Sequence, residues 1–113
     1  MGMFDDVEFS YRMPDGYEDH AYQSKSLDCT GDTYTVTPEG RLVRTYSSGY
    51  PDEVLQPLGD LNFDGELNIY TSDLGGGWHE YDLVFVNGGL REIRCHQTEG
   101  RLVFEPVAVP KLK

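Results

Sequence analysis

Carboxylates are the most abundant side chains able to do chemistry in this 113-residue chain, and many of them lie in one stretch. Residues 52–82 hold eight acidic residues and no Lys or Arg, a local charge of −8. They are Asp52, Glu53, Asp60, Asp64, Glu66, Asp73, Glu80 and Asp82. Like charges held on a rigid surface attract a cationic partner, whereas a solvated acidic face only keeps a small protein soluble. Both interpretations stay open, and these eight residues form the candidate partner-binding site.

Residues 60–68 read DLNFDGELN and place oxygen-bearing side chains at alternate positions, with Gly65 in the sixth position. Oxygen ligands in this pattern suit a hard cation, and glycine allows the sharp turn. The segment resembles the first nine positions of EF-hand and dockerin calcium loops. The twelfth position, which should supply a bidentate carboxylate, holds Thr71. Asp64-Gly65 is better explained as a hairpin turn, so we predict no metal site and no cofactor.

Histidine and cysteine could provide metal ligands or a nucleophile, but their spacing favours neither. His20, His79 and His96 match no zinc signature. Cys95 and His96 are adjacent in a predicted strand, so they should point to opposite faces, which argues against a Cys–His nucleophile pair. The chain has no Gly-x-Ser-x-Gly elbow and no phosphate-binding loop. We therefore expect a non-enzymatic protein without catalytic residues, in which Cys29 and Cys95 are reduced thiols.

Strands must position these side chains, because strand-forming residues are common and Ala occurs only twice. Apolar residues alternate with polar ones over 7–13, which predicts a strand. Further strands are predicted at 21–27, 33–37, 41–46, 66–71, 79–86, 90–96 and 101–109. Glycine-containing turns between them favour a mostly antiparallel meander. Residues 51–56 alone indicate one or two helical turns, with Pro51 at the first helical position.

Two details of this pattern bear on the candidate site. If the strand after Gly65 pairs with 79–86, one side of the pair is acidic and the other apolar. The acidic side would carry Glu66, Glu80 and Asp82, and the buried side Leu67, Ile69, Tyr81, Leu83 and Phe85. Most aromatic residues are expected in the core. Those that flank loops or end strands, and could instead form a carbohydrate- or protein-binding patch, are Trp78, Tyr50, Tyr46 and Tyr70.

The pentapeptide EGRLV occurs at 39–43 and again at 99–103. The flanking residues do not match, so we interpret it as shared turn chemistry rather than a tandem repeat.

Composition limits the remaining choices. The net charge of −11 disfavours direct binding to nucleic acid or to an anionic membrane. No run of 18 apolar residues and no signal peptide is present. We therefore expect a soluble, cytoplasmic protein with one all-β domain over residues 1–113, a sandwich or half-open barrel of seven or eight strands.

Several short segments carry a resemblance. They are Met3 to Asp5 with Tyr11, Pro14 and Asp15, then residues 22–29 (YQSKSLDC) and 34–42, and further on Trp78, Glu80, Tyr81, Phe85 and residues 88–90. With these segments the chain resembles a group of short proteins encoded by phages and prophages, a group with no established activity. The resemblance implies a mobile-element setting and a host-cell cytoplasmic location, and it transfers no functional residue.

The function expected from the sequence is that of a phage or prophage interaction protein that presents an acidic face to a basic protein, for example as a nucleic-acid mimic or inhibitor. One alternative is a self-associating structural or accessory protein of the virion. Another is a calcium-dependent carbohydrate-binding module built on residues 60–68 and surface aromatics. The sequence does not identify the partner or the oligomeric state.

Overall fold

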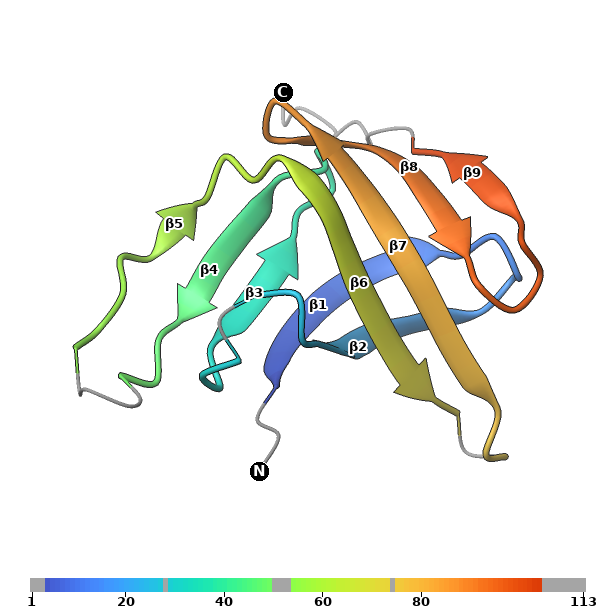
Figure 1. Cartoon of the computed structure of the whole chain (residues 1–113), viewed down its shortest axis with the longest axis horizontal. Coiled ribbons are helices and arrows are strands. Elements are labelled where there is room, and N and C mark those ends of the chain that lie inside the picture. Colours follow the sequence, from blue (N-terminus) through green and yellow to red (C-terminus); the bar gives the residue numbers. More distant parts are fainter. Residues whose placement is uncertain (1–3, 28, 50–53, 74, 105–113) are drawn as a thin grey trace, which may run out of the picture.

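The computed structural model describes residues 4–27, 29–49, 54–73 and 75–104, apart from the side chains of residues 19 and 20 (Figure 1). Its strands are β1 (Asp5–Arg12), β2 (Glu18–Ser24), β3 (Thr33–Val36), β4 (Leu42–Tyr46), β5 (Gly59–Asp60), β6 (Gly65–Ser72), β7 (Trp78–Val86), β8 (Gly89–Cys95) and β9 (Arg101–Val103). They form one sheet in the order β5-β4-β3-β1-β2-β6-β7-β8-β9. The described residues contain no helix, and the all-β prediction is confirmed.

All eight predicted strands are present, and the short strand β5 is the addition. Of the strand predicted at 101–109, residues 105–109 lie outside the described part. So do residues 51–53 of the predicted helix, while residues 54–56 are irregular. The Gln56 N–H donates to Ser47 Oγ (2.8 Å) instead of a helical carbonyl. Val54 and Leu55 are 62% and 70% exposed, so no apolar helix face is buried here.

The sheet departs from a meander at β1 and β2. β3 pairs in parallel with β1, from Asp6–Thr33 to Glu8–Thr35, and β2 pairs with β6 instead of β3. The link between β2 and β6 is narrow, with Gln23 opposite Tyr70. In Figure 1, β6 and β7 cross in front of β1 and β2, so the sheet folds over itself at this link.

A buried carboxylate fixes the connection from β2 to β3, which crosses β1 and places β3 parallel to it. Asp5 Oδ1 accepts the backbone N–H groups of Thr30, Gly31 and Asp32 (3.1, 3.0 and 2.9 Å), and Oδ2 accepts that of Cys29 (2.8 Å). Cys29 and Gly31 adopt φ values of 58° and 83°, which turn the N–H groups toward one point. The Asp5 side chain therefore fixes the loop that brings β3 alongside β1.

The core lies between the two layers of the folded sheet, on the apolar side of each strand. Its β6–β7 part is the set predicted from alternation: Leu67, Ile69, Tyr81 and Leu83 are fully buried, and Phe85 is 1% exposed. Leu67 lies opposite Leu83, and Ile69 lies opposite Tyr81. Because side chains alternate along a strand, burying these residues directs their neighbours outward.

Candidate partner-binding face

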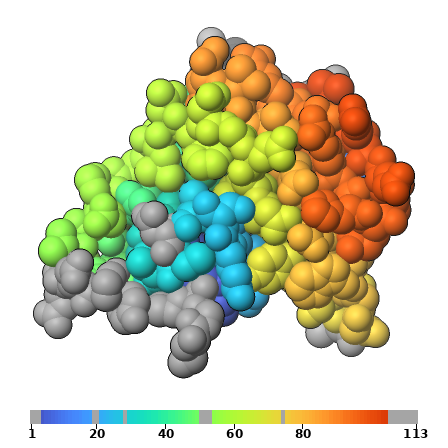
Figure 2. Space-filling model, viewed as in Figure 1, coloured from blue at the N-terminus to red at the C-terminus, as the bar shows by residue number. Residues whose placement is uncertain are grey.

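The outward side of β6, β7 and β8 brings together three of the predicted site residues, Glu66, Glu80 and Asp82, with other polar and aromatic side chains. We define the outer face as Glu66, Asn68 and Tyr70 of β6, Trp78, Glu80 and Asp82 of β7, Glu92 and Arg94 of β8, and His96. Register brings them into rows, with Asn68 opposite Asp82 and Asp82 opposite Arg94. In Figure 2, the yellow, orange and red residues of β6 to β9 form one continuous surface on the right of the view.

Two carboxylates at the centre of the outer face are held by neutral donors. Asn68 Nδ2 donates to Glu80 Oε2 (2.9 Å) and to Asp82 Oδ1 (3.0 Å). Trp78 Nε1 donates to Glu80 Oε1 (3.0 Å). The Trp78 hydrogen bond lowers the pKa of Glu80, burial opposes it, and the Asn68 bond adds to the lowering. Glu80 therefore stays ionised, and the two uncharged donors orient its carboxylate.

His96 lies beside the same two carboxylates. Its Nε2 is 2.9 Å from Asp82 Oδ2, and its Nδ1 is 3.8 Å from Glu80 Oε2. A neutral imidazole can donate one N–H to Asp82 and leave both negative charges in place.

The acids at the edge of the outer face are balanced by arginines. Arg94 lies 3.5 Å from Glu66 and 3.4 Å from Glu92. Arg101 of β9 lies 3.7 Å from Glu92. Among the described residues, Glu80 and Asp82 are the outer-face acids with no arginine within 4 Å, and Arg94 interacts with Asp82 only over a longer distance.

Aromatic rings flank this charged centre. Tyr70 and Trp78 are stacked, with ring centroids 5.3 Å apart and planes 20° apart. Trp78 is 49% exposed and is tied to Glu80 through its indole N–H. Of the other aromatic candidates, Tyr46 is exposed on β4, away from this pair, and Tyr50 lies outside the described residues.

The remaining predicted site residues do not join Glu66, Glu80 and Asp82. Asp60 lies on β5, at the opposite end of the sheet order, and binds Arg41 Nε at 2.6 Å. Asp64 accepts the Asn87 N–H (2.8 Å) at the far end of the β6–β7 pair. Asp52 and Glu53 lie outside the described residues.

Asp73 is used within the β6–β7 turn. Its Oδ1 accepts the N–H groups of Gly75 and Gly77 (2.9 and 2.8 Å), and its Oδ2 lies 2.9 Å from His79 Nε2. The Asp73 carboxylate thus accepts hydrogen bonds from N–H groups of its own turn and contacts His79. The six described acids of the predicted site therefore divide into two sets: Glu66, Glu80 and Asp82 lie on the outer face, and Asp60, Asp64 and Asp73 have separate structural roles.

Residues 60–68 also show why their calcium-loop pattern has another explanation. The side-chain oxygens of Asp60 and Asn62 both face Arg41, at 2.6 and 3.3 Å. Asp64 is directed instead to the backbone of Asn87. The Arg41 guanidinium thus binds the oxygen atoms that a calcium ion would need as ligands. Across the described residues, no group of three or more His, Cys, Asp or Glu side chains could hold a metal ion.

Sequence reasoning missed Asn68 and His96 as members of the outer face. The signal was present for Asn68, because the predicted pairing places it opposite Asp82. It was present for His96 as well, since Cys95 is buried and its neighbour must point outward. Both cysteines are free, and Cys29 is only partly buried.

No protein-family model, curated protein or solved structure matches this chain. A search of the described residues also finds no helix that is long and apolar enough to span a membrane.

Proposed function

We propose that this protein is a non-enzymatic interaction protein, acting in a phage or prophage setting, whose outer face binds a basic segment of another protein. The observation that carries the proposal is the state of Glu80 and Asp82. Both are oriented by neutral Asn68 and Trp78 donors or by His96, and neither forms an ion pair with Lys or Arg in the described residues. Such carboxylates are fixed in geometry and retain their charge for a cationic partner.

The aromatic pair indicates which cation fits best. A guanidinium can form hydrogen bonds with Glu80 or Asp82 while its flat surface stacks on an exposed aromatic ring. Trp78 is exposed and lies next to Glu80, so both contacts are available within one site. An arginine side chain satisfies this arrangement better than a lysine, whose ammonium is compact and strongly hydrated.

Nucleic-acid mimicry is one form of this function. In that form, the basic segment is the DNA- or RNA-binding groove of the partner, and the outer-face carboxylates take the place of phosphates. Duplex DNA would then compete with this protein for the partner.

The test uses a peptide of alternating Arg and Gly and follows binding by calorimetry at low and high salt. Affinity should fall as salt rises. The double variant Glu80→Gln/Asp82→Asn should bind about tenfold more weakly, roughly 1.4 kcal/mol. A lysine peptide of equal charge should bind more weakly than the arginine peptide.

The matched control is Asp6→Asn/Glu39→Gln, which removes the same formal charge from exposed positions outside the outer face. It should bind the arginine peptide within about twofold of wild type. Equal weakening by both double variants would show that only total charge matters, and the proposed site would then be wrong.

A further inference from the structure

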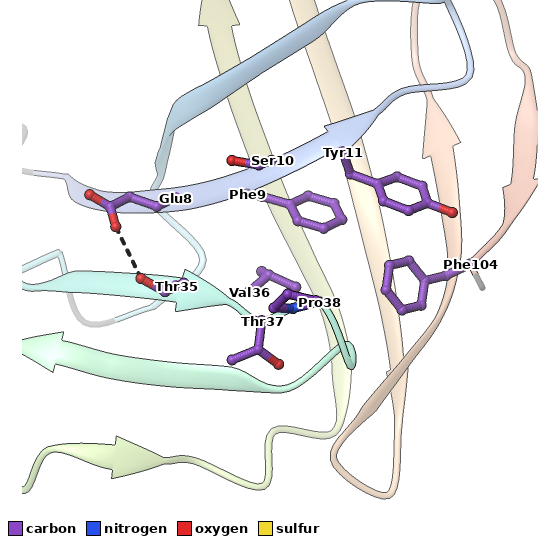
Figure 3. Close-up of a pocket in the computed structure, with 9 residues that line it drawn as sticks. All are labelled: Glu8, Phe9, Ser10, Tyr11, Thr35, Val36, Thr37, Pro38 and Phe104. Atoms are coloured by element: carbon purple, nitrogen blue, oxygen red, sulfur yellow. Dashed lines mark hydrogen bonds between the residues drawn. The ribbon is translucent and has the colours of Figure 1, made fainter. Parts of the chain in front are cut away.

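A cavity of about 450 Å³ opens on another part of the molecule, between the second half of β1 and the end of β3 (Figure 3). Glu8 to Tyr11 line one side and residues 35–38 the other, and Phe104, just after β9, completes the wall. This volume is within the range of small-molecule sites, which is about 300–1,000 Å³. None of these residues belongs to the outer face.

The cavity exists because two neighbouring strands separate. β1 continues to Arg12, but within the described residues its pairing with β3 ends at Glu8–Thr35. Pro38 has no N–H with which to extend the ladder. The chain instead turns back, with the Thr37 N–H donating to the Arg41 carbonyl (2.9 Å). The fork between the strands is therefore built into the fold.

Aromatic rings form the inner wall of the fork. The rings of Phe9 and Tyr11 are nearly parallel, with centroids 5.4 Å apart and planes 3° apart. Phe104 packs against Tyr11 with centroids 4.9 Å apart. Phe9 and Phe104 are 2% and 5% exposed, so core packing fixes their positions. A preformed apolar wall of this kind favours an aromatic or aliphatic ligand body.

One carboxylate lies at the mouth of this apolar space. Glu8 is exposed, and its Oε1 accepts the Thr35 hydroxyl (3.1 Å), as Figure 3 shows. Among the side chains that the structure describes, which do not include His20, no Lys, Arg or His forms an ion pair with Glu8. A carboxylate held by a neutral hydroxyl next to an aromatic wall is complementary to a ligand that joins an apolar body to a positive charge.

We propose that this cavity is a binding site for a small organic amine, with its aromatic or aliphatic body against Phe9, Tyr11 and Phe104 and its ammonium group at Glu8. The amine and an alcohol of the same shape should differ in affinity, because only the amine can form the ion pair. The site is independent of the proposed partner binding by the outer face.

The probe is 2-phenylethylamine, compared with 2-phenylethanol by calorimetry or by NMR titration of the intact protein. Wild type should bind the amine more tightly than the alcohol. Glu8→Gln should weaken amine binding about tenfold and change alcohol binding less than about twofold. Glu39→Gln, an exposed charge removal in the adjacent turn and outside the cavity wall, should leave amine binding as in wild type.

Nuclear Overhauser contacts locate the probe. Contacts from the phenyl protons of the amine to Phe104 and Tyr11 would support the proposal. Three results would overturn it. The first is no saturable binding of the amine at about 10 mM. The others are equal affinity for the amine and the alcohol, and equal weakening of amine binding by Glu8→Gln and Glu39→Gln. Contacts to Trp78 in place of Phe104 would overturn it as well.

Discussion

Acidic residues in the interior and on the outer face of this protein are held by different kinds of donor. Asp5 is fully buried and accepts four backbone N–H groups of the loop before β3. The Glu80 and Asp82 side chains are 28% and 26% exposed and accept side-chain donors from Asn68, Trp78 and His96. An acid bound to backbone groups fixes the path of the chain. An acid bound to side chains is oriented at the surface and can still meet a partner.

Removing the Asp5 carboxylate should have the largest effect on stability. Asp5→Ala leaves four backbone N–H groups without their acceptor in a partly buried loop, and we expect a loss of about 4 kcal/mol in the free energy of unfolding. The measurement is urea denaturation followed by circular dichroism. The neighbouring exposed acid is the control: Asp6→Ala should cost less than about 0.5 kcal/mol. Similar losses in the two variants would show that the buried Asp5 carboxylate contributes no more to stability than an exposed one.

The ion pair between Asp32 and Arg44 should come next. Asp32 is 1% exposed, and its Oδ2 lies 3.4 Å from Arg44 Nε. Arg44→Met leaves this charge buried without its arginine, so we expect a loss of about 3 kcal/mol. The double variant Asp32→Asn/Arg44→Met removes both charges and should lose less than Arg44→Met alone. A larger loss in the double variant, measured by the same urea denaturation, would contradict this account.

A pH-dependent contribution should come from His79. Its Nδ1 lies 3.0 Å from Asp15 Oδ2, its Nε2 lies 2.9 Å from Asp73 Oδ2, and Tyr17 stacks on its ring. Burial lowers the pKa of His79, but the hydrogen bonds with Asp73 and Asp15 outweigh it and raise the pKa above its ordinary value. For Asp15, burial raises the pKa, and the bonds with His79, Tyr17 and Tyr81 lower it further than burial raises it.

The sign of the pH dependence follows from these directions. A raised histidine pKa contributes stability that is complete below about pH 6.5 and is lost as pH rises through the folded-state value. The lowered pKa of Asp15 contributes stability above about pH 4 that is lost in acid. The thermal midpoint of wild type should therefore exceed that of His79→Gln by a few degrees between about pH 4 and 6.5. The difference in thermal midpoint should shrink at higher pH. A difference that stays constant across pH would contradict an ionic interaction of protonated His79 with Asp15 and Asp73.

The smallest effect on stability should come from the outer face. Glu80→Gln/Asp82→Asn retains oxygen acceptors for Asn68 and Trp78 and removes the repulsion between two like charges. We expect the free energy of unfolding to stay within about 0.5 kcal/mol of wild type while binding of the arginine peptide weakens. If urea denaturation shows that the double variant loses several kcal/mol in the free energy of unfolding, Glu80 and Asp82 are structural residues, as Asp5 is.

Alternation and turn residues were sufficient to predict most strands and the buried side of β6 and β7. They also predicted the common face of Glu66, Glu80 and Asp82, because register within one hairpin follows from local sequence. The contact of His79 with Asp15 could not be predicted, because it joins the β1–β2 turn to the start of β7, 64 residues further along the chain. The parallel pairing of β1 and β3 depends on Asp5 meeting residues 24 to 27 positions away.

The two EGRLV segments also show that contacts with distant residues limit what can be predicted from local sequence. Both form hairpin turns, as predicted. In the first, Gly40 has a φ of 89°, and an added Cβ would lie 2.8 Å from Phe104 Cε2. In the second, the positive φ, 56°, is at Glu99. Identical residues therefore predict a turn but not its backbone conformation, which depends on what packs against it.

The central place of β1 in the sheet has a consequence for synthesis on the ribosome. β1 emerges before the two strands that flank it, β2 and β3, and it pairs as far along the chain as Thr35. The ring of Phe9 on β1 packs against Phe104, 95 residues further along the chain, so Phe9 is fully covered only after Phe104 has been made. During translation, β1 is therefore a segment that a chaperone would need to shield.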